Sequence, residues 1–151
     1  MIKIICVGKI KEKFFQEAIK EYTKRLSKYT KLEIIEVEDM KGDNPQVIMN
    51  KEKDLILKKI SDKDYIITLE IEGKELSSKD FSKYLDQTFL NHSNITFIIG
   101  GSYGLDPQIK EMSHFKLSFS KMTFPHQLFR VLLLEQIYRS YKISNNESYH
   151  K

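Results

Sequence analysis

Five short runs of apolar residues recur along the chain, separated by longer amphipathic stretches. The first, Ile2 to Val7, is nearly continuous, which is typical of a strand buried in a parallel sheet. The others are also rich in β-branched and aromatic residues, and most of them end at glycine or polar turn residues. The pattern predicts strands at residues 2–7, 32–37, 65–71, 95–99 and 117–120.

The stretches between these runs carry apolar residues at three- and four-residue spacing, the period of an amphipathic helix. The first such face contains Phe14, Phe15, Ala18, Ile19, Tyr22 and Leu26. We expect helices at about residues 11–29, 45–60, 79–90 and 107–112 and from 125 onward, with Ser77 or Ser78 capping the third. Strict alternation of strand and helix predicts an α/β fold, a parallel sheet with flanking helices, in one domain spanning residues 1–151.

The stretch from residue 95 to residue 142 is the most informative part of the chain. Its first strand stops at Gly100-Gly101, where the backbone must turn sharply or let another group approach. The next loop runs into a long helix, with Pro125 in the first turn and Thr123 as the expected N-cap. Ligands of open α/β sheets bind beyond the carboxyl ends of the strands. Both loops are therefore expected to line a site. The apolar face of the helix is expected to contain Leu128, Val131, Leu132, Glu135, Tyr138 and Tyr141.

Composition bounds the class of protein. With 40% hydrophobic and 30% charged residues, the chain fits a soluble globular protein, and no apolar run reaches the ~20 residues that span a bilayer. The N-terminus is too short and too strand-like for a signal peptide. The lone Cys6 excludes an internal disulfide and fits a reducing cytoplasm, where we expect it to be buried in the first strand.

The net charge of +4 lies entirely in the last quarter of the chain. Residues 1–109 balance 18 basic against 18 acidic side chains, whereas residues 110–151 hold seven basic and three acidic ones. A positive surface on one side favours a polyanionic partner, nucleic acid first, and a solvated basic helix is the simpler alternative.

Several kinds of site are excluded or disfavoured by the motifs. The chain has no P-loop, no dinucleotide-binding glycine pattern and no nucleophile elbow. A metal site is not expected, since His92, His114, His126 and His150 are dispersed and unpaired. What remains is a pocket of loops with a basic rim, which suits a nucleotide-like ligand held by backbone groups and an anionic substrate.

Four segments closely resemble the ribosomal RNA large subunit methyltransferase H family. They are residues 98–105 (IIGGSYGL), 117–127 (LSFSKMTFPHQ), 130–139 (RVLLLEQIYR) and the terminal Tyr149-His150-Lys151, and residues 7–13 and 68–74 also match. The resemblance implies a SPOUT-type fold with a C-terminal trefoil knot, a homodimer, and S-adenosylmethionine as methyl donor. It also implies methylation of N3 of a pseudouridine in large-subunit (23S) ribosomal RNA on the assembled ribosome, in the cytoplasm.

The resemblance also implies site residues. The family's cofactor contacts fall on Leu69, Gly100, Phe119, Ser120, Lys121, Met122, Thr123 and Phe124. Leu69 is expected to end its strand beside the adenine. Catalytic candidates are His150, which orients the base or accepts its proton, Tyr149, and Arg139. Arg139 and Arg130 are proposed to hold phosphates or the target nucleotide, although either could instead pair with Glu135. Residues 144–148 lack the glycine usual before the family's Tyr-His tail.

The last helix is expected to contribute to the dimer interface, with the partner completing the active site.

Two other functions stay open. One is an RNA-binding module without catalysis, which would keep the basic C-terminus but need no cofactor loop. The other is a flavodoxin-type enzyme that uses a nucleotide cofactor and no RNA.

Overall fold

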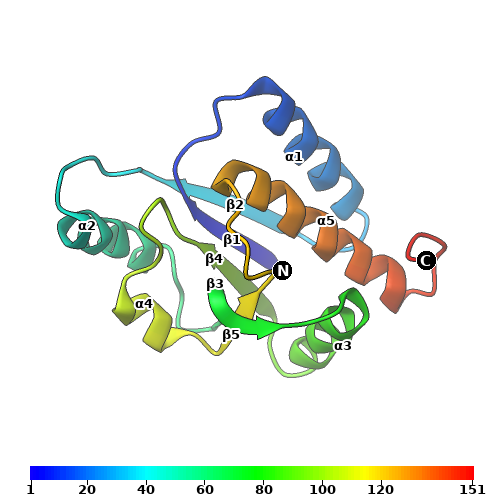
Figure 1. Cartoon of the computed structure of the whole chain (residues 1–151). Helices are drawn as coiled ribbons and strands as arrows, with labels where there is room; N and C mark the ends of the chain where they lie inside the picture. Colours follow the sequence, from blue (N-terminus) through cyan, green and yellow to red (C-terminus); the bar gives the residue numbers. More distant parts are fainter.

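A five-stranded parallel sheet forms the centre of the computed structural model, which describes residues 1–151 (Figure 1). The strands are β1 (Ile2–Val7), β2 (Leu32–Val37), β3 (Asp64–Glu75), β4 (Asn94–Ile99) and β5 (Phe115–Ser118). Their order in the sheet is β2-β1-β4-β3-β5, and every neighbouring pair is parallel. The predicted α/β class and parallel sheet are confirmed.

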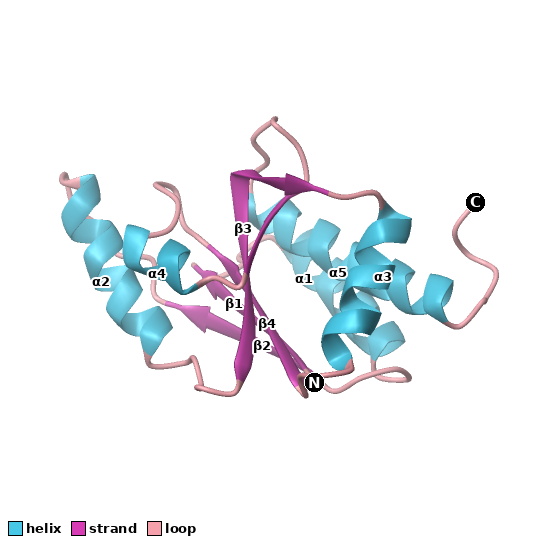
Figure 2. Cartoon of the chain, turned by 90° about the horizontal axis from the view of Figure 1, so that it is seen from below, coloured by secondary structure: helices cyan, strands magenta, loops and turns pink.

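Five helices alternate with the strands and cover both faces of the sheet. They are α1 (Lys13–Leu26), α2 (Pro45–Leu57), α3 (Ser78–Phe89), α4 (Pro107–Met112) and α5 (His126–Ser144). Figure 2 shows α1, α3 and α5 on one side of the sheet and α2 and α4 on the other. None of these helices is both long and apolar enough to cross a membrane.

Each face of the sheet has its own core. The larger core joins the sheet to α1, α3 and α5 through buried residues that include Phe97, Leu133 and Ile137. The smaller core joins it to α2 and α4, with Ile56 and Ile109 fully or almost fully buried. At about 25 cal/mol per Å² of apolar surface, the burial of such side chains is the main force that fixes the helices to the sheet.

Several local predictions need correction. Phe14 is 66% exposed and does not face the core. Leu69 does not end its strand, because β3 continues to Glu75 past an irregularity in its pairing with β5. Thr123 is not a helix cap, since α5 begins at His126 with Pro125 at the N-cap position and no side-chain cap. Ser77 does cap α3, where its hydroxyl accepts a hydrogen bond from the backbone N–H of Asp80.

The most buried face of α5 agrees with the predicted one only in part, since it includes Tyr138 but not the predicted leucines and valine. Leu133, Leu134 and Ile137 are fully buried against the sheet, whereas Leu128, Val131 and Leu132 are only half-buried. The helix therefore carries apolar residues on two faces, and the second is only partly covered by this chain.

Candidate functional site

A cavity of about 690 Å³ opens at the carboxyl ends of β3, β4 and β5, beside the start of α5. We call it the main cavity. It lies where parallel α/β sheets bind ligands, and its volume falls in the range of small-molecule sites. Its lining combines backbone-rich turns with apolar side chains, and it consists of residues 69–71, 99–102, 104, 117–120, 122–127 and 129.

Seven of the eight predicted cofactor residues line this cavity. Leu69 comes from β3 and Gly100 from the turn after β4, and the remainder from the loop between β5 and α5 (Phe119, Ser120, Met122, Thr123 and Phe124). Lys121 lies in the same loop but is exposed and does not line the cavity. The fold thus brings together segments that are some 50 residues apart in the sequence.

The loop between β5 and α5 is held by its own hydrogen bonds and by aromatic packing. The Ser118 hydroxyl donates to the carbonyl of Ser120, and the backbone N–H of Met122 donates to the Ser120 hydroxyl. The rings of Phe119 and Phe124 both pack on Phe129 in α5, with centroid distances of 4.8 and 6.0 Å. This arrangement leaves Met122, 75% exposed, at the edge of the cavity.

Gly100 is required by a close approach of backbone to backbone. A Cβ at this position would lie 2.7 Å from the carbonyl carbon of Gly104 and 2.9 Å from its oxygen. Gly101 and Gly104 form an isolated bridge, and Gly104 has φ +81°, which favours glycine. The turn is therefore built by three glycines, and the structural reason for Gly100 is the approach of Gly104.

Two carboxylates near the cavity were not among the predicted residues. Glu70 is the only acidic residue in the lining, and its side chain accepts a hydrogen bond from the Thr68 hydroxyl at 2.6 Å. Glu52 of α2 is 3% exposed and lies next to Gly101. Burial raises the pKa of Glu52 to about 7, although its carboxylate accepts a hydrogen bond from the Met40 N–H. Neither side chain stands out in the sequence, because each is one Glu among many in its element.

Arg130 is placed differently from the prediction. Its guanidinium is almost fully buried, donates to Glu36 at 2.6 Å and to the carbonyl of Gly8 at 3.1 Å, and does not contact Glu135. Arg130 therefore joins α5 to the ends of β1 and β2. In this position it is not available to hold the phosphates of an RNA.

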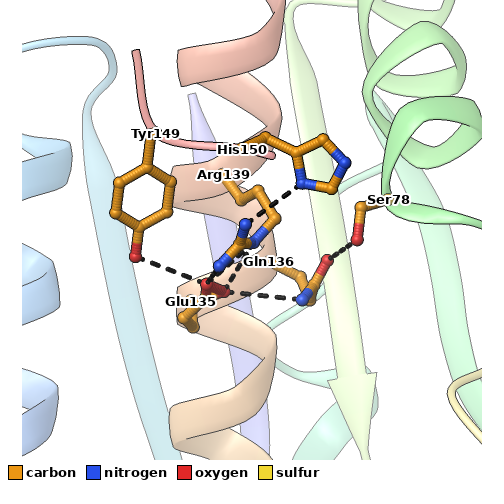
Figure 3. A network of polar contacts seen from close by, with 6 residues as sticks. All are labelled: Ser78, Glu135, Gln136, Arg139, Tyr149 and His150. Carbon is orange, nitrogen blue, oxygen red and sulfur yellow. Dashed lines mark hydrogen bonds and ion pairs between the residues drawn. The ribbon is translucent and has the colours of Figure 1, made fainter.

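The remaining predicted residues gather at the far end of α5 (Figure 3). The Arg139 guanidinium pairs with Glu135 one turn earlier, at 2.5 Å, and lies over the ring of Tyr149, 4.7 Å from its centroid. Arg139 also contacts Nδ1 of His150 at 3.1 Å. The predicted alternative, a pair between Arg139 and Glu135, is thus present. Arg139, Tyr149 and His150 form one cluster.

A left-handed residue sets the course of the C-terminal tail, residues 145–151. Asn146 adopts φ +54° just after α5, a conformation that asparagine tolerates at helix ends. Asn146 thus supplies the left-handed backbone in a segment that contains no glycine. Glu147 then fixes the tail by accepting hydrogen bonds from the Tyr29 hydroxyl at 2.8 Å and from Lys142 at 3.0 Å.

The tail cluster and the main cavity are separate within one chain. Arg139, Tyr149 and His150 are all absent from the cavity lining. Phe129 is the last residue of α5 in that lining, and Arg139 follows ten residues later, ~15 Å along the helix axis at 1.5 Å per residue. The geometry supplies a binding cavity at one end of α5 and a polar cluster at the other. No group of three or more His, Cys, Asp or Glu side chains is arranged to hold a metal ion.

Comparison with known proteins identifies the family. The model of a family described as "Predicted SPOUT methyltransferase" matches residues 1–150. Proteins named ribosomal RNA large subunit methyltransferase H from Clostridium tetani and Clostridium botulinum are 55% and 54% identical to this chain, and one from Clostridium perfringens is 52% identical. Each match covers 99% of both sequences. The chain therefore belongs to the SPOUT methyltransferases and, among them, to the ribosomal RNA large subunit methyltransferase H family.

Proposed function

We propose that this protein is an S-adenosylmethionine-dependent methyltransferase that methylates N3 of a pseudouridine in large-subunit ribosomal RNA, on the assembled ribosome in the cytoplasm. The observation that carries the proposal is the main cavity. Seven side chains or glycines that the family resemblance assigns to the cofactor meet there from three separate segments. The names of the full-length relatives supply the substrate class.

The residues of the main cavity fit an adenosine-containing cation. The apolar side chains of Leu69, Phe119 and Phe124 can enclose a flat ring, while the 119–124 loop offers backbone N–H and C=O groups to its polar edge. Glu70 is the only acidic residue in the lining, and its carboxylate, which lies 3.9 Å from Lys110, would be close to the positive sulfonium of the ligand. When bound, S-adenosylmethionine supplies an electrophilic methyl group, so the protein must orient the acceptor and stabilise it as its proton leaves.

The acceptor requires help with deprotonation. The imide N3–H of a uracil ring is weakly acidic, closer to the ~10 of a tyrosine than to the ~6.5 of a histidine. Cations and hydrogen-bond donors near the ring carbonyls favour the anion. Arg139 and His150 supply such groups, and Tyr149 packs beside them.

A dimer would bring the two parts of the site together. We infer that α5 pairs with α5 of a second copy through Leu128, Val131 and Leu132, which this chain leaves half-exposed. An isologous contact between antiparallel helices would place the tail of one subunit beside the main cavity of the other. We also propose that the C-terminal half of the chain forms a trefoil knot, as its membership of the SPOUT methyltransferases implies.

The first test is calorimetric titration with S-adenosylmethionine, followed by methyl transfer from labelled cofactor to 70S ribosomes. We expect binding and transfer by the wild type and loss of binding in Gly100→Val. A folded wild type that binds ribosomes but neither binds S-adenosylmethionine nor transfers a methyl group would favour an RNA-binding module without catalysis. Binding of a flavin in place of S-adenosylmethionine would favour the flavodoxin-type alternative.

A further inference from the structure

Glu135 is the centre of the polar cluster at the end of α5 (Figure 3). Its carboxylate accepts hydrogen bonds from Nε of Arg139 at 2.9 Å and from Nη2 at 2.5 Å. The Tyr149 hydroxyl donates to the same oxygen at 3.4 Å. Gln136, whose side-chain oxygen accepts from the Ser78 hydroxyl at 2.7 Å, donates to the other oxygen at 3.4 Å. One carboxylate therefore orients a cation and a phenol at the same time.

The two shorter hydrogen bonds to Glu135, both of which end on Oε1, determine which nitrogen of Arg139 remains free. With Nε and Nη2 bound to Glu135, Nη1 points to Nδ1 of His150 at 3.1 Å. The Tyr149 ring covers one face of the guanidinium, 4.7 Å from its centre, and Tyr149 packs edge-on against Tyr138. Planar guanidinium groups held in this way have few other orientations. The direction of the Nη1–H bond is thus fixed by packing as well as by charge.

This contact defines the tautomer of His150. A guanidinium has five N–H donors and no acceptor, so Nδ1 of His150 must be the acceptor and carries no proton. A neutral imidazole has one proton, which must then lie on Nε2. The Nδ1 lone pair is occupied by Arg139, and Nε2 presents an N–H. In this arrangement neither ring nitrogen is free to take a proton from a substrate.

We propose that Glu135 is a positioning residue that acts through Arg139, and that His150 consequently serves the reaction as a hydrogen-bond donor rather than as the proton acceptor. This inference rests on the proposed function. The Nε2–H of His150 donates a hydrogen bond to a ring carbonyl oxygen next to N3 of the target base. That oxygen gains negative charge when N3 is deprotonated, and a fixed donor stabilises it.

The methyl transfer to N3 can be written without a side chain that acts as a base. The N3–H bond breaks, and its proton passes to solvent water or hydroxide. The N3 electron pair forms the new bond to the methyl carbon, and the pair of the broken carbon–sulfur bond stays on sulfur, which becomes a neutral thioether. Tyr149 does not take the proton either, because its hydroxyl donates to Glu135, and burial followed by the Glu135 charge raises the pKa of the phenol. The residues of the cluster hold and polarise the base.

Nitrogen-15 NMR of the histidine rings tests the tautomer without any need for activity. The chain has four histidines, and His150→Gln identifies the signals of His150 by their loss. We expect a protonated Nε2 and an unprotonated Nδ1 in the wild-type protein, and a mixture of tautomers in Glu135→Ala. A His150 with its proton on Nδ1 in the wild type would overturn the proposal.

Kinetics with labelled cofactor and ribosomes separate the two roles of His150. Glutamine places an amide N–H near the position of Nε2 but cannot accept a proton as a base. We expect His150→Gln to keep kcat within about tenfold of the wild type, whereas His150→Ala loses about 10²- to 10³-fold, as for removal of a donor to developing charge. Equal loss in both variants would show that His150 is the base and would overturn the proposal.

Glu135 is tested with a matched control on α1. Glu21 and Arg25 form the same i,i+4 pair, and Arg25 also lies over a tyrosine ring. We expect Glu135→Ala to lower kcat by about 10- to 100-fold, in the range of outer-shell partners, with KM for the cofactor unchanged. Glu135→Gln should be intermediate and Glu21→Gln silent. Full activity of Glu135→Ala would exclude the positioning role.

Failure of this inference can be told apart from failure of the proposed function. If the wild-type protein binds no S-adenosylmethionine and methylates no ribosomes, the proposed function is wrong. If the wild-type protein methylates ribosomes but His150 carries its proton on Nδ1, only this inference is wrong. The same holds if His150→Gln is as inactive as His150→Ala.

Discussion

Gly100 shows how one missing side chain shapes the main cavity. The backbone of Gly104 occupies the space that a Cβ would need, at 2.7 Å. Contacts that close do not occur in folded proteins, so any side chain at position 100 must displace the turn. The turn forms one wall of the cavity, and the displacement would therefore be felt by the ligand.

We expect Gly100→Ala to weaken S-adenosylmethionine binding by at least about tenfold and to lower the free energy of unfolding by about 1–3 kcal/mol, the usual cost of overpacking. Calorimetric titration and urea unfolding measure the two effects. Tight binding by a fully stable Gly100→Ala protein would contradict the assigned role of this turn.

Glu52 makes stability depend on pH. Burial raises the pKa of its carboxyl from 4.5 to about 7 in the folded protein. Between these values the unfolded chain has lost the proton while the folded chain still holds it, so the free energy of unfolding falls as the pH rises. Above about pH 7 both states are ionised and this contribution stays constant.

Glu52→Gln should remove the fall in the free energy of unfolding that the ionisation of Glu52 causes. We expect the variant to be more stable than the wild type at pH 8, by on the order of 2 kcal/mol, and the difference to shrink as the pH approaches 4.5. The amide oxygen can still accept from the Met40 N–H, so the loop it holds should persist. Urea unfolding at a series of pH values is the measurement, and a difference that does not vary with pH would argue against an ionised buried Glu52.

At the scale of elements, α5 shows what a hydrophobic pattern can and cannot decide. Its existence and start near Pro125 follow from the sequence, because the apolar spacing is long and regular. Which face is buried does not follow, since Leu133 and Ile137 compete with Leu128 and Val131 at the same period. Which of these residues are buried depends on how the helix packs against the sheet, and the sequence of the helix alone does not determine that packing.

The half-exposed face of α5 leads to a prediction about assembly. A lysine in place of Leu132 would bury a charge in the inferred dimer contact, and we expect it to weaken dimerisation by about 100-fold or more. Light scattering during size-exclusion chromatography measures the mass. Leu90→Lys is the matched control, because Leu90 is 82% exposed and lies on α3's C-cap. A Leu132→Lys protein that stays dimeric would place the interface elsewhere.

At the scale of the whole molecule, the strand–helix alternation was enough to predict all ten elements and the parallel sheet. The cavity needed more, because Leu69, Gly100 and Phe119 are joined only by the strand order, in which β3 lies between β4 and β5. Family resemblance located those residues. Neither source could show that Arg130 turns inward to Glu36, since a buried arginine on an apolar helix has the same sequence pattern as an exposed one.

The distance between main cavity and tail cluster makes the last prediction one about pairs of subunits. In Gly100→Val the cavity is damaged but the tail intact, and in His150→Ala the reverse holds. If the tail of one subunit serves the cavity of the other, a mixed dimer contains one site with both defects and one site with none. Random mixing gives half mixed dimers, so we expect the mixture of two inactive variants to recover about a quarter of the wild-type rate. If each site were built within one subunit, every site would keep a defect, and the mixture would stay inactive.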